Sequence, residues 1–129
     1  MKFYERLEIW AFKLRSKSLY HELKYYVERK TPHIRTFHRW NGRGIGKTYN
    51  LMKISGKYRI PVLEPVGIAR QYLPRLYKKF NPIVVNSEEL RIGYKPGTIV
   101  LVDERQLLNN RAKEILKDYI QIGFEMENN

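Results

Sequence analysis

The residues best suited to chemistry form a glycine-rich run that ends in a lysine and a threonine. The run consists of Asn41, Gly42, Arg43, Gly44, Ile45, Gly46, Lys47 and Thr48. It nearly matches the phosphate-binding pattern G-x-x-x-x-G-K-[ST], in which small residues let backbone N–H groups surround phosphate oxygens. In that pattern the lysine reaches the terminal phosphates and the Ser/Thr hydroxyl is a ligand of Mg²⁺. We therefore expect Lys47 to contact phosphate and Thr48 to contact Mg²⁺.

A second candidate group lies further along the chain, where residues 98–102 are β-branched or apolar and Asp103 and Glu104 follow them. An unbroken apolar run of this kind is typical of a strand that is buried on both faces of a parallel sheet. Open α/β sheets bind ligands at the carboxyl ends of their strands, which is where the two carboxylates would lie. We predict that Asp103 binds Mg²⁺ and that Glu104 polarises the attacking water.

Taken together, the two motifs resemble those of the P-loop NTPases, in the additional-strand branch with a catalytic glutamate beside the Walker B aspartate. The resemblance covers residues 33–124, and the loop over residues 42–48 is most similar to those of phage DNA-packaging motor ATPases. It implies ATP and Mg²⁺ as cofactors. Asn41 replaces the first glycine of the pattern, but asparagine tolerates left-handed backbone angles. The packaging motors carry a further domain, often a nuclease, for which 129 residues leave no room.

The resemblance also implies roles for several other residues. Arg43 would supply a positive charge near the γ-phosphate and act as a catalytic residue with Lys47 and Glu104. Such ATPases commonly hydrolyse at subunit interfaces, so Arg105 and Arg111 are candidates to act in trans within a homo-oligomer, or they are ordinary surface charges. The last strand of this superfamily carries a polar sensor of the γ-phosphate, for which Gln121 and Asn128 are candidates.

Composition points to an anionic partner. The net charge is +12 and the pI is about 10.0, and residues 1–48 hold 12 of the 25 Lys and Arg residues against 4 of the 13 Asp and Glu residues. This excess favours DNA or RNA as a partner, although a generic basic protein would have the same balance. There are no cysteines, which excludes disulfides and cysteine metal sites. We expect no membrane span and no signal peptide, hence a cytoplasmic protein, in the host cytoplasm if it is viral.

These motifs need a sheet and helices to position them. We predict an α/β fold with a three-layer P-loop NTPase-like core, whose mostly parallel sheet has about four to five strands. Residues 1–32 would be an N-terminal helical extension packed on the core, with Ser16 and Ser18 as possible breaks, and residues 33–129 a compact P-loop NTPase domain. The cations of the extension that are the best candidates for nucleic-acid contacts are Lys13, Arg15, Lys17, Lys24, Arg29 and Lys30.

Within the core, the pattern predicts a strand over residues 33–40, unusually polar for a central one, and a helix over 47–55 ended by Gly56. Pro61 indicates an edge strand or a strand start over residues 60–63. Further along, we predict two helices, over residues 67–80, with a kink at Pro74, and over residues 105–118. We also predict strands over residues 83–85, 90–92 and 119–124, the first two possibly joined as a hairpin.

Three functions fit these observations. The first is a Mg²⁺-dependent ATPase that acts on nucleic acid, of viral or mobile-element type. The second is a small-molecule kinase, which would need a lid with arginines and an acceptor pocket. The third is a non-hydrolysing module that binds nucleotide or nucleic acid and keeps a relic phosphate loop. The pair Asp103 and Glu104 favours the first.

Overall fold

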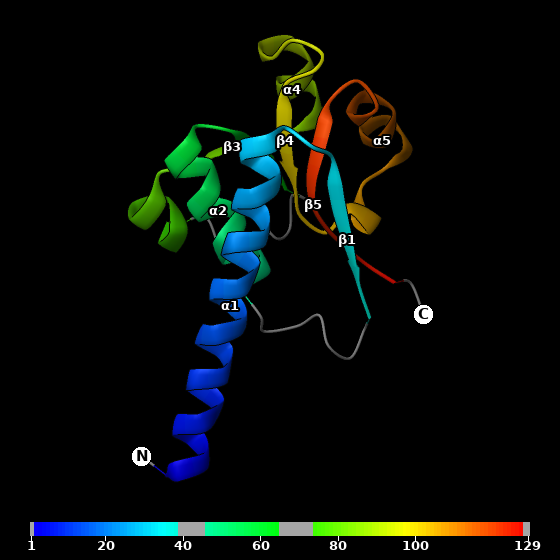
Figure 1. Ribbon diagram of the computed structural model, residues 1–129. Helices are drawn as coiled ribbons and strands as arrows, with labels where there is room; N and C mark the ends of the chain where they lie inside the picture. Colours follow the sequence, from blue (N-terminus) through cyan, green and yellow to red (C-terminus); the bar gives the residue numbers. More distant parts are fainter. Residues whose placement is uncertain (1, 39–45, 65–73, 128–129) are drawn as a thin grey trace.

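A parallel β-sheet forms the centre of the molecule (Figure 1). The computed structural model describes residues 2–38, 46–64 and 74–127. In these ranges the sheet has five strands, all parallel, in the order β1-β5-β4-β2-β3. The strands are β1 (His33–Phe37), β2 (Pro61–Leu63), β3 (Ile83–Val85), β4 (Ile99–Val102) and β5 (Ile120–Met126). The predicted α/β fold class with a parallel sheet of this size is confirmed.

Helices cover both faces of the sheet, which makes three layers. They are α1 (Phe3–Arg29), α2 (Lys47–Tyr58), α4 (Ser87–Gly93) and α5 (Asn110–Leu116), with a 3₁₀ turn η1 (Arg105–Leu107). Residues 74–80 are also helical, so part of the predicted helix 67–80 is present, while residues 65–73 lie outside the described part of the chain. Side chains of successive strand residues point to opposite faces of the sheet, so each strand contributes to two cores. The core on one face is shared with α1 and α2, and the core on the other face is shared with α4 and α5.

The alternation is clear in the two central strands. Val62 and Leu101 belong to the core under α1 and α2, whereas Leu63 and Val102 belong to the core under α4 and α5. All four side chains are almost completely buried. Because both faces are covered, β2 and β4 are apolar at every position, and the apolar run of β4 is the pattern that predicted a parallel sheet.

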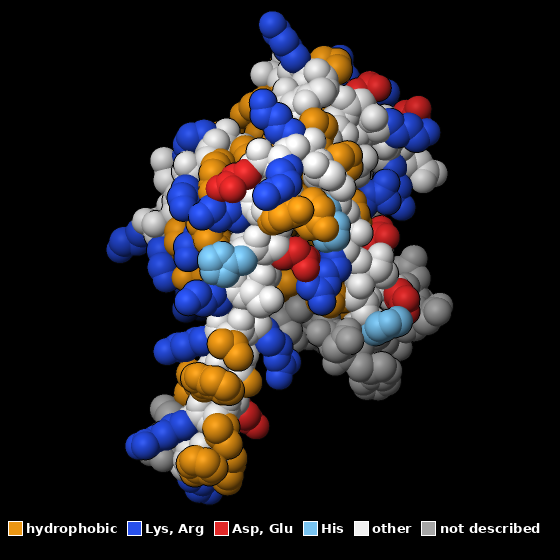
Figure 2. Space-filling model, in the orientation of Figure 1, with side chains coloured by type: hydrophobic (Ala, Val, Ile, Leu, Met, Phe, Trp, Pro, Cys, Tyr) orange, Lys and Arg blue, Asp and Glu red, His pale blue; other side chains and the backbone are white. Residues whose placement is uncertain are grey.

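Helix α1 is continuous, so the predicted breaks at Ser16 and Ser18 are wrong. Serine is only mildly unfavourable inside a helix, and burial of Leu19, Leu23 and Val27 against the core outweighs that preference. The N-terminal half of α1 projects away from the domain (Figures 1 and 2). Its large apolar side chains are exposed: Phe3, Tyr4, Leu7, Ile9, Trp10, Phe12 and Leu14.

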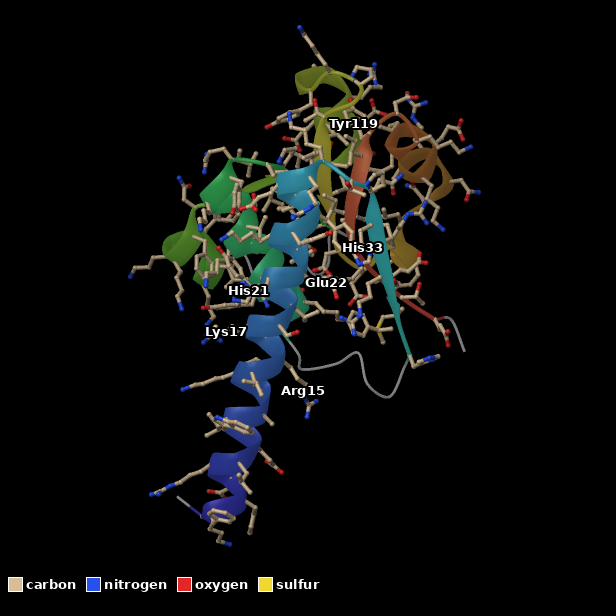
Figure 3. The ribbon with its side chains drawn as sticks, viewed as in Figure 1. Arg15, Lys17, His21, Glu22, His33 and Tyr119 are labelled. Carbon is tan, nitrogen blue, oxygen red and sulfur yellow. The ribbon has the colours of Figure 1, made fainter. Side chains whose placement is uncertain are left out.

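The polar strand that was predicted over residues 33–40 is β1, and it lies at the edge of the sheet. It pairs with β5 along one side, which explains why it carries more polar residues than β4. His33 stacks on Tyr26 of α1 with 3.8 Å between ring centroids, and its Nε2 lies 3.5 Å from Glu22 Oε2 (Figure 3). Arg35 donates a 2.9 Å hydrogen bond to the same carboxylate. These contacts fasten β1 to α1 and give His33 a structural role.

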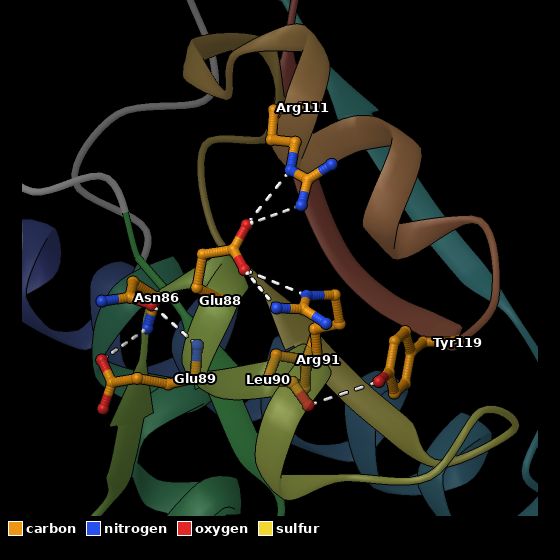
Figure 4. Close-up of polar contacts among 7 residues, drawn as sticks. All are labelled: Asn86, Glu88, Glu89, Leu90, Arg91, Arg111 and Tyr119. Atoms are coloured by element: carbon orange, nitrogen blue, oxygen red, sulfur yellow. Dashed lines mark hydrogen bonds and ion pairs between the residues drawn. The ribbon is translucent and has the colours of Figure 1, made fainter.

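The strand predicted over residues 90–92, and the hairpin with it, are wrong, because this segment is α4. The side chain of Asn86 accepts a 2.9 Å hydrogen bond from the backbone N–H of Glu89, and the carboxylate of Glu89 accepts one of 3.2 Å from the N–H of Asn86 (Figure 4). This reciprocal capping box stabilises the first turn of the helix. Leu90 is then the buried anchor of α4 rather than a strand residue.

Two other helix boundaries differ from the prediction. Helix α2 continues through Gly56 to Tyr58 and ends at Arg59, which has a left-handed backbone. Gly56 is required by close packing, since a Cβ there would lie 1.9 Å from the backbone oxygen of Phe80. The helix predicted over residues 105–118 is divided into η1 and α5, because Asn109 caps α5 through a 2.8 Å hydrogen bond from Ala112 N.

Candidate active site

The carboxyl ends of β2 and β4 and the amino end of α2 meet at one edge of the sheet. In the parallel pairing of β2 with β4, Leu63 lies beside Val102. The residues that follow them, Glu64 and Asp103, therefore leave the sheet at the same level, and Asp103 N donates a 3.3 Å hydrogen bond to Leu63 O. This edge is where parallel α/β sheets place their ligand sites.

Thr48 and Asp103 are in direct contact. The hydroxyl of Thr48 donates a 2.5 Å hydrogen bond to Asp103 Oδ2. Asp103 is completely buried (0% exposed), and its other oxygen, Oδ1, has no hydrogen-bond partner in the described part of the chain. The two residues that the sequence separately predicts as Mg²⁺ ligands are thus brought together, and Asp103 still has an oxygen available.

Glu64 is a second buried carboxylate of this site, and its role was not predicted from the sequence. Its side chain is 6% exposed, and among the described residues no donor group contacts its carboxylate oxygens, whose hydrogen-bonding neighbour is the carboxylate of Asp103. Burial raises the pKa of Glu64 to about 10, and the charge of nearby Asp103 adds to the shift. Burial also raises the pKa of Asp103, although the hydrogen bond from Thr48 opposes that shift.

The chemistry of this oxygen set fits a Mg²⁺ ion. Buried carboxylate oxygens without partners are costly, and hard divalent cations prefer such oxygens as ligands. Within the described ranges, no group of three or more His, Cys, Asp or Glu side chains is arranged to hold a metal on its own. Mg²⁺ in nucleotide sites is usually bound by one or two carboxylates together with phosphate oxygens and water.

Lys47 lies next to these acids and is largely buried (9% exposed). Its Nζ is 3.9 Å from Glu104 Oε1 and 3.1 Å from the sulfur of Met126, at the end of β5. It also lies 5.2 Å from the ring centroid of Phe37, at the end of β1. The ammonium group of Lys47 therefore lies at the ends of β1 and β5, beside Glu104.

Glu104 has a left-handed backbone, with φ of 48°. This conformation costs a residue with a side chain about 1–2 kcal/mol, and such strain is found mainly at functional positions. Gln106 donates a hydrogen bond from Nε2 to Glu104 Oε2, and Gln106 Oε1 accepts a 2.8 Å bond from Met126 N. Gln106 thus connects the carboxylate of Glu104 to β5, a role that no motif indicated.

Gly46 connects the phosphate motif to α1. Its φ is 81°, and a Cβ at this position would lie 2.7 Å from Ser16 Oγ, so glycine is required both by conformation and by space. The side chain of Asn50 donates hydrogen bonds of 2.9 Å to Gly46 O and to Ser16 O. The middle of α1 is therefore packed against the residue that precedes Lys47.

Part of the predicted site lies outside the described residues. This applies to the loop residues Asn41, Gly42, Arg43, Gly44 and Ile45, and to the sensor candidate Asn128. The other sensor candidate, Gln121, pairs with Val100 near the amino end of β4, and its Nε2 donates a 3.0 Å bond to Leu116 O. Gln121 therefore lies toward the opposite end of the strands from Asp103.

The two arginines predicted to act in trans have partners within the chain. Arg105 donates a 2.9 Å hydrogen bond to Gln121 Oε1 and lies 3.5 Å from Glu125. Arg111 lies 3.0 Å from Glu88, which also binds Arg91 (Figure 4). Both arginines therefore have polar or acidic partners within their own chain.

The predicted nucleic-acid contacts are distributed along α1, and Arg15 and Lys17 extend away from the sheet (Figure 3). Five of the six are exposed: Lys13, Arg15, Lys17, Arg29 and Lys30. Lys24 is half-buried and lies 3.9 Å from Glu28. Lys and Arg side chains are numerous on this side of the molecule (Figure 2).

Comparison of the chain with protein-family models, curated proteins and solved structures gives no match. In the described part of the chain, no helix combines the length and apolar character that crossing a membrane requires.

Proposed function

We propose that this protein is a P-loop ATPase that binds ATP with Mg²⁺, hydrolyses it and acts with nucleic acid. The observation that carries the proposal is the 2.5 Å contact between Thr48 and Asp103. The two residues come from separate motifs, and P-loop NTPases use this pair to hold Mg²⁺. If the glycine-rich run matched the phosphate-binding pattern only by chance, there would be no reason for Thr48 to contact Asp103.

The strand order gives further support. The additional-strand branch takes its name from a strand between the one that feeds the phosphate loop and the one that carries the acidic pair. β5 lies between β1 and β4 in the sheet and pairs with both. This arrangement brings the end of β5 beside Lys47, where Met126 contacts the ammonium group.

The proposed mechanism assigns one task to each side chain. Lys47 neutralises charge on the terminal phosphates, and α2, which begins at Lys47, adds the positive end of its helix dipole. Glu104 orients water for in-line attack on the γ-phosphorus, and Gln106 keeps the carboxylate of Glu104 in place. Mg²⁺, when bound, would reduce the negative charge of the phosphates.

The nucleic-acid part of the proposal is supported by charge. The net charge of +12 belongs to a chain of only 129 residues, and exposed Lys and Arg side chains follow the length of α1. Binding to a polyanion releases counterions, so affinity should fall steeply as salt increases. A source in a virus or mobile element, and a homo-oligomer, remain predictions from the loop resemblance.

The test is ATP hydrolysis at low salt with and without duplex or single-stranded DNA. We expect ATP turnover to increase with DNA. Lys47→Ala should lose both turnover and ATP binding. Glu104→Gln should lose turnover but still bind ATP. Lys117→Ala is the matched control, since this exposed lysine pairs with Glu114 on the surface of the molecule. Binding of ATP without turnover would favour the non-hydrolysing module, and dependence of turnover on an added phosphoryl acceptor would favour a kinase. Absence of ATP binding would contradict the proposal.

A further inference from the structure

We propose that Glu64 is a second carboxylate of the divalent-cation site and acts together with Asp103, by accepting hydrogen bonds from water molecules bound to the cation. The inference extends the proposed function, because it concerns the same cation. It depends, however, on cation binding rather than on hydrolysis, and the two can be tested separately.

The placement of Glu64 follows from the sheet. It comes directly after β2, whose neighbour on one side is β4, and the pairing of Leu63 with Val102 sets the register. Glu64 and Asp103 therefore leave adjacent strands at the same level and at the edge that faces the amino end of α2. The hydroxyl of Thr48, on the first turn of α2, already contacts Asp103.

The burial of Glu64 requires an explanation. Buried polar side chains are normally hydrogen-bonded, and Asn50 and Ser55 of this protein follow the rule. Asn50 is buried and donates to Ser16 and Gly46, and Ser55 is buried and donates a 2.7 Å bond to Ile60 O. Glu64 is an exception, since both of its oxygens are buried and no donor group in the described ranges contacts them. Its hydrogen-bonding neighbour is the carboxylate of Asp103, and two acids can share a hydrogen bond only while one of them holds a proton.

The unpartnered atoms define the chemistry of what binds. They are both oxygens of Glu64 and Oδ1 of Asp103, and all three are acceptors once a bound cation has displaced the proton that the two acids share. A ligand that satisfies them must carry positive charge or donate hydrogen bonds. A hydrated divalent cation does both, because Mg²⁺ retains several water ligands when protein carboxylates bind it.

The test measures binding of Mn²⁺, a spectroscopic substitute for Mg²⁺, to the full chain without nucleotide. Free Mn²⁺ is quantified by electron paramagnetic resonance in wild type, Glu64→Gln and Asp103→Asn. The control is Glu114→Gln, which removes the same charge from an exposed residue. We expect Glu64→Gln to weaken Mn²⁺ binding by about 10- to 100-fold, as replacing groups around metal ligands commonly does. Asp103→Asn should weaken it at least as much, and the control should match wild type.

A second measurement shows whether each variant is folded, and it detects Mn²⁺ binding that is too weak to measure without nucleotide. Thermal unfolding is followed in EDTA, in Mn²⁺, and in Mn²⁺ with a non-hydrolysable ATP analogue. In EDTA, Glu64→Gln should unfold at the wild-type temperature or above, because it removes an unpaired buried acid. Its increase in unfolding temperature with Mn²⁺ should be much smaller than that of wild type. If Glu64→Gln does not fold, Glu64→Asp, which keeps the charge but shortens the side chain, should show an intermediate loss of Mn²⁺ response.

The outcomes separate this inference from the proposed function. If Glu64→Gln responds to Mn²⁺ as wild type does in both measurements, or if wild type does not respond at all, the role of Glu64 is refuted. If Mn²⁺ binding depends on Glu64 but the wild type does not hydrolyse ATP, the cation site stands and the ATPase proposal fails.

Discussion

Asn50 of α2 and Ser16 of α1 are joined by two hydrogen bonds, of 2.9 Å to the backbone oxygen of Ser16 and 3.1 Å to its hydroxyl. The same amide also donates to Gly46 O. One side chain therefore connects the long N-terminal helix to the residue that precedes Lys47, so the docking of α1 supports the backbone at Gly46.

We predict that Asn50→Ala lowers the free energy of unfolding by about 2–3 kcal/mol, because it removes three hydrogen bonds that a buried amide donates. Urea denaturation followed by circular dichroism measures the change. Asn110→Ala, at an exposed position of α5, should change stability by less than about 0.5 kcal/mol. Equal stabilities of the two variants would mean that the Asn50 contacts contribute nothing.

The two halves of α1 should respond differently to truncation of leucine. Leu23 is completely buried, so Leu23→Ala should cost about 2–5 kcal/mol through lost contacts and a residual cavity. Leu7 is exposed in the projecting half, and Leu7→Ala should change stability by less than about 0.5 kcal/mol. Chemical denaturation of both variants tests this. A large loss in Leu7→Ala would show that the N-terminal half of α1 is covered in solution.

Gln106 should affect hydrolysis more than nucleotide binding. It contacts Glu104 and the end of β5, so Gln106→Ala should misplace the carboxylate of Glu104. Misplacement of about 1 Å can cost about 10²-fold in rate, and we expect kcat to fall by that order while KM for ATP changes little. Steady-state kinetics gives both constants. A large rise in KM with unchanged kcat would contradict the positioning role.

Arg111 should act on Glu88 rather than on a neighbouring subunit. Hydrogen bonds from Arg91 and Arg111 lower the pKa of Glu88 below its ordinary 4.5. The ionised pair therefore stabilises the fold above that value, and its contribution is lost as pH falls through the lowered pKa. Carboxyl-carbon NMR titration should give a higher Glu88 pKa in Arg111→Gln than in wild type.

The same variant tests the alternative role of Arg111. If its only partner of consequence is Glu88, Arg111→Gln should hydrolyse ATP at the wild-type rate at every protein concentration. A loss of turnover that becomes larger at concentrations favouring oligomers, with the pKa of Glu88 unchanged, would support action in trans.

The parts of this structure that sequence could predict are those with a local signal. The apolar run ending at Asp103 indicated a buried parallel strand, and the glycine-rich motif indicated the helix that begins at Lys47. Thr48 and Asp103 were each predicted to bind Mg²⁺ because each belongs to a motif of the P-loop NTPases, but their direct contact was not predicted. Glu64 had no such signal, since a single acid after a three-residue strand becomes informative only when the register of β2 and β4 is known.

The errors also have physical causes. The segment over residues 90–92 alternates apolar and polar residues, which indicated a strand, but the capping box formed by Asn86 and Glu89 determines a helix. Gly56 was expected to end α2, yet its conformation is helical and the missing Cβ serves contact with Phe80. The polarity of β1 was unexplained until its place at the edge of the sheet was known.

The position of β1 has a consequence for biosynthesis. β1 is made before the other described strands and its hydrogen-bonded neighbour, β5, is made after them, with Thr36 and Glu125 separated by 89 residues. At typical translation speeds of about 5–20 residues per second, the edge strand waits several seconds for its partner. β1 can pair only after β5 has been made, so removal of β5 should prevent β1 from joining the sheet. Synthesis of β5, rather than of the segments before it, therefore controls when β1 takes its place.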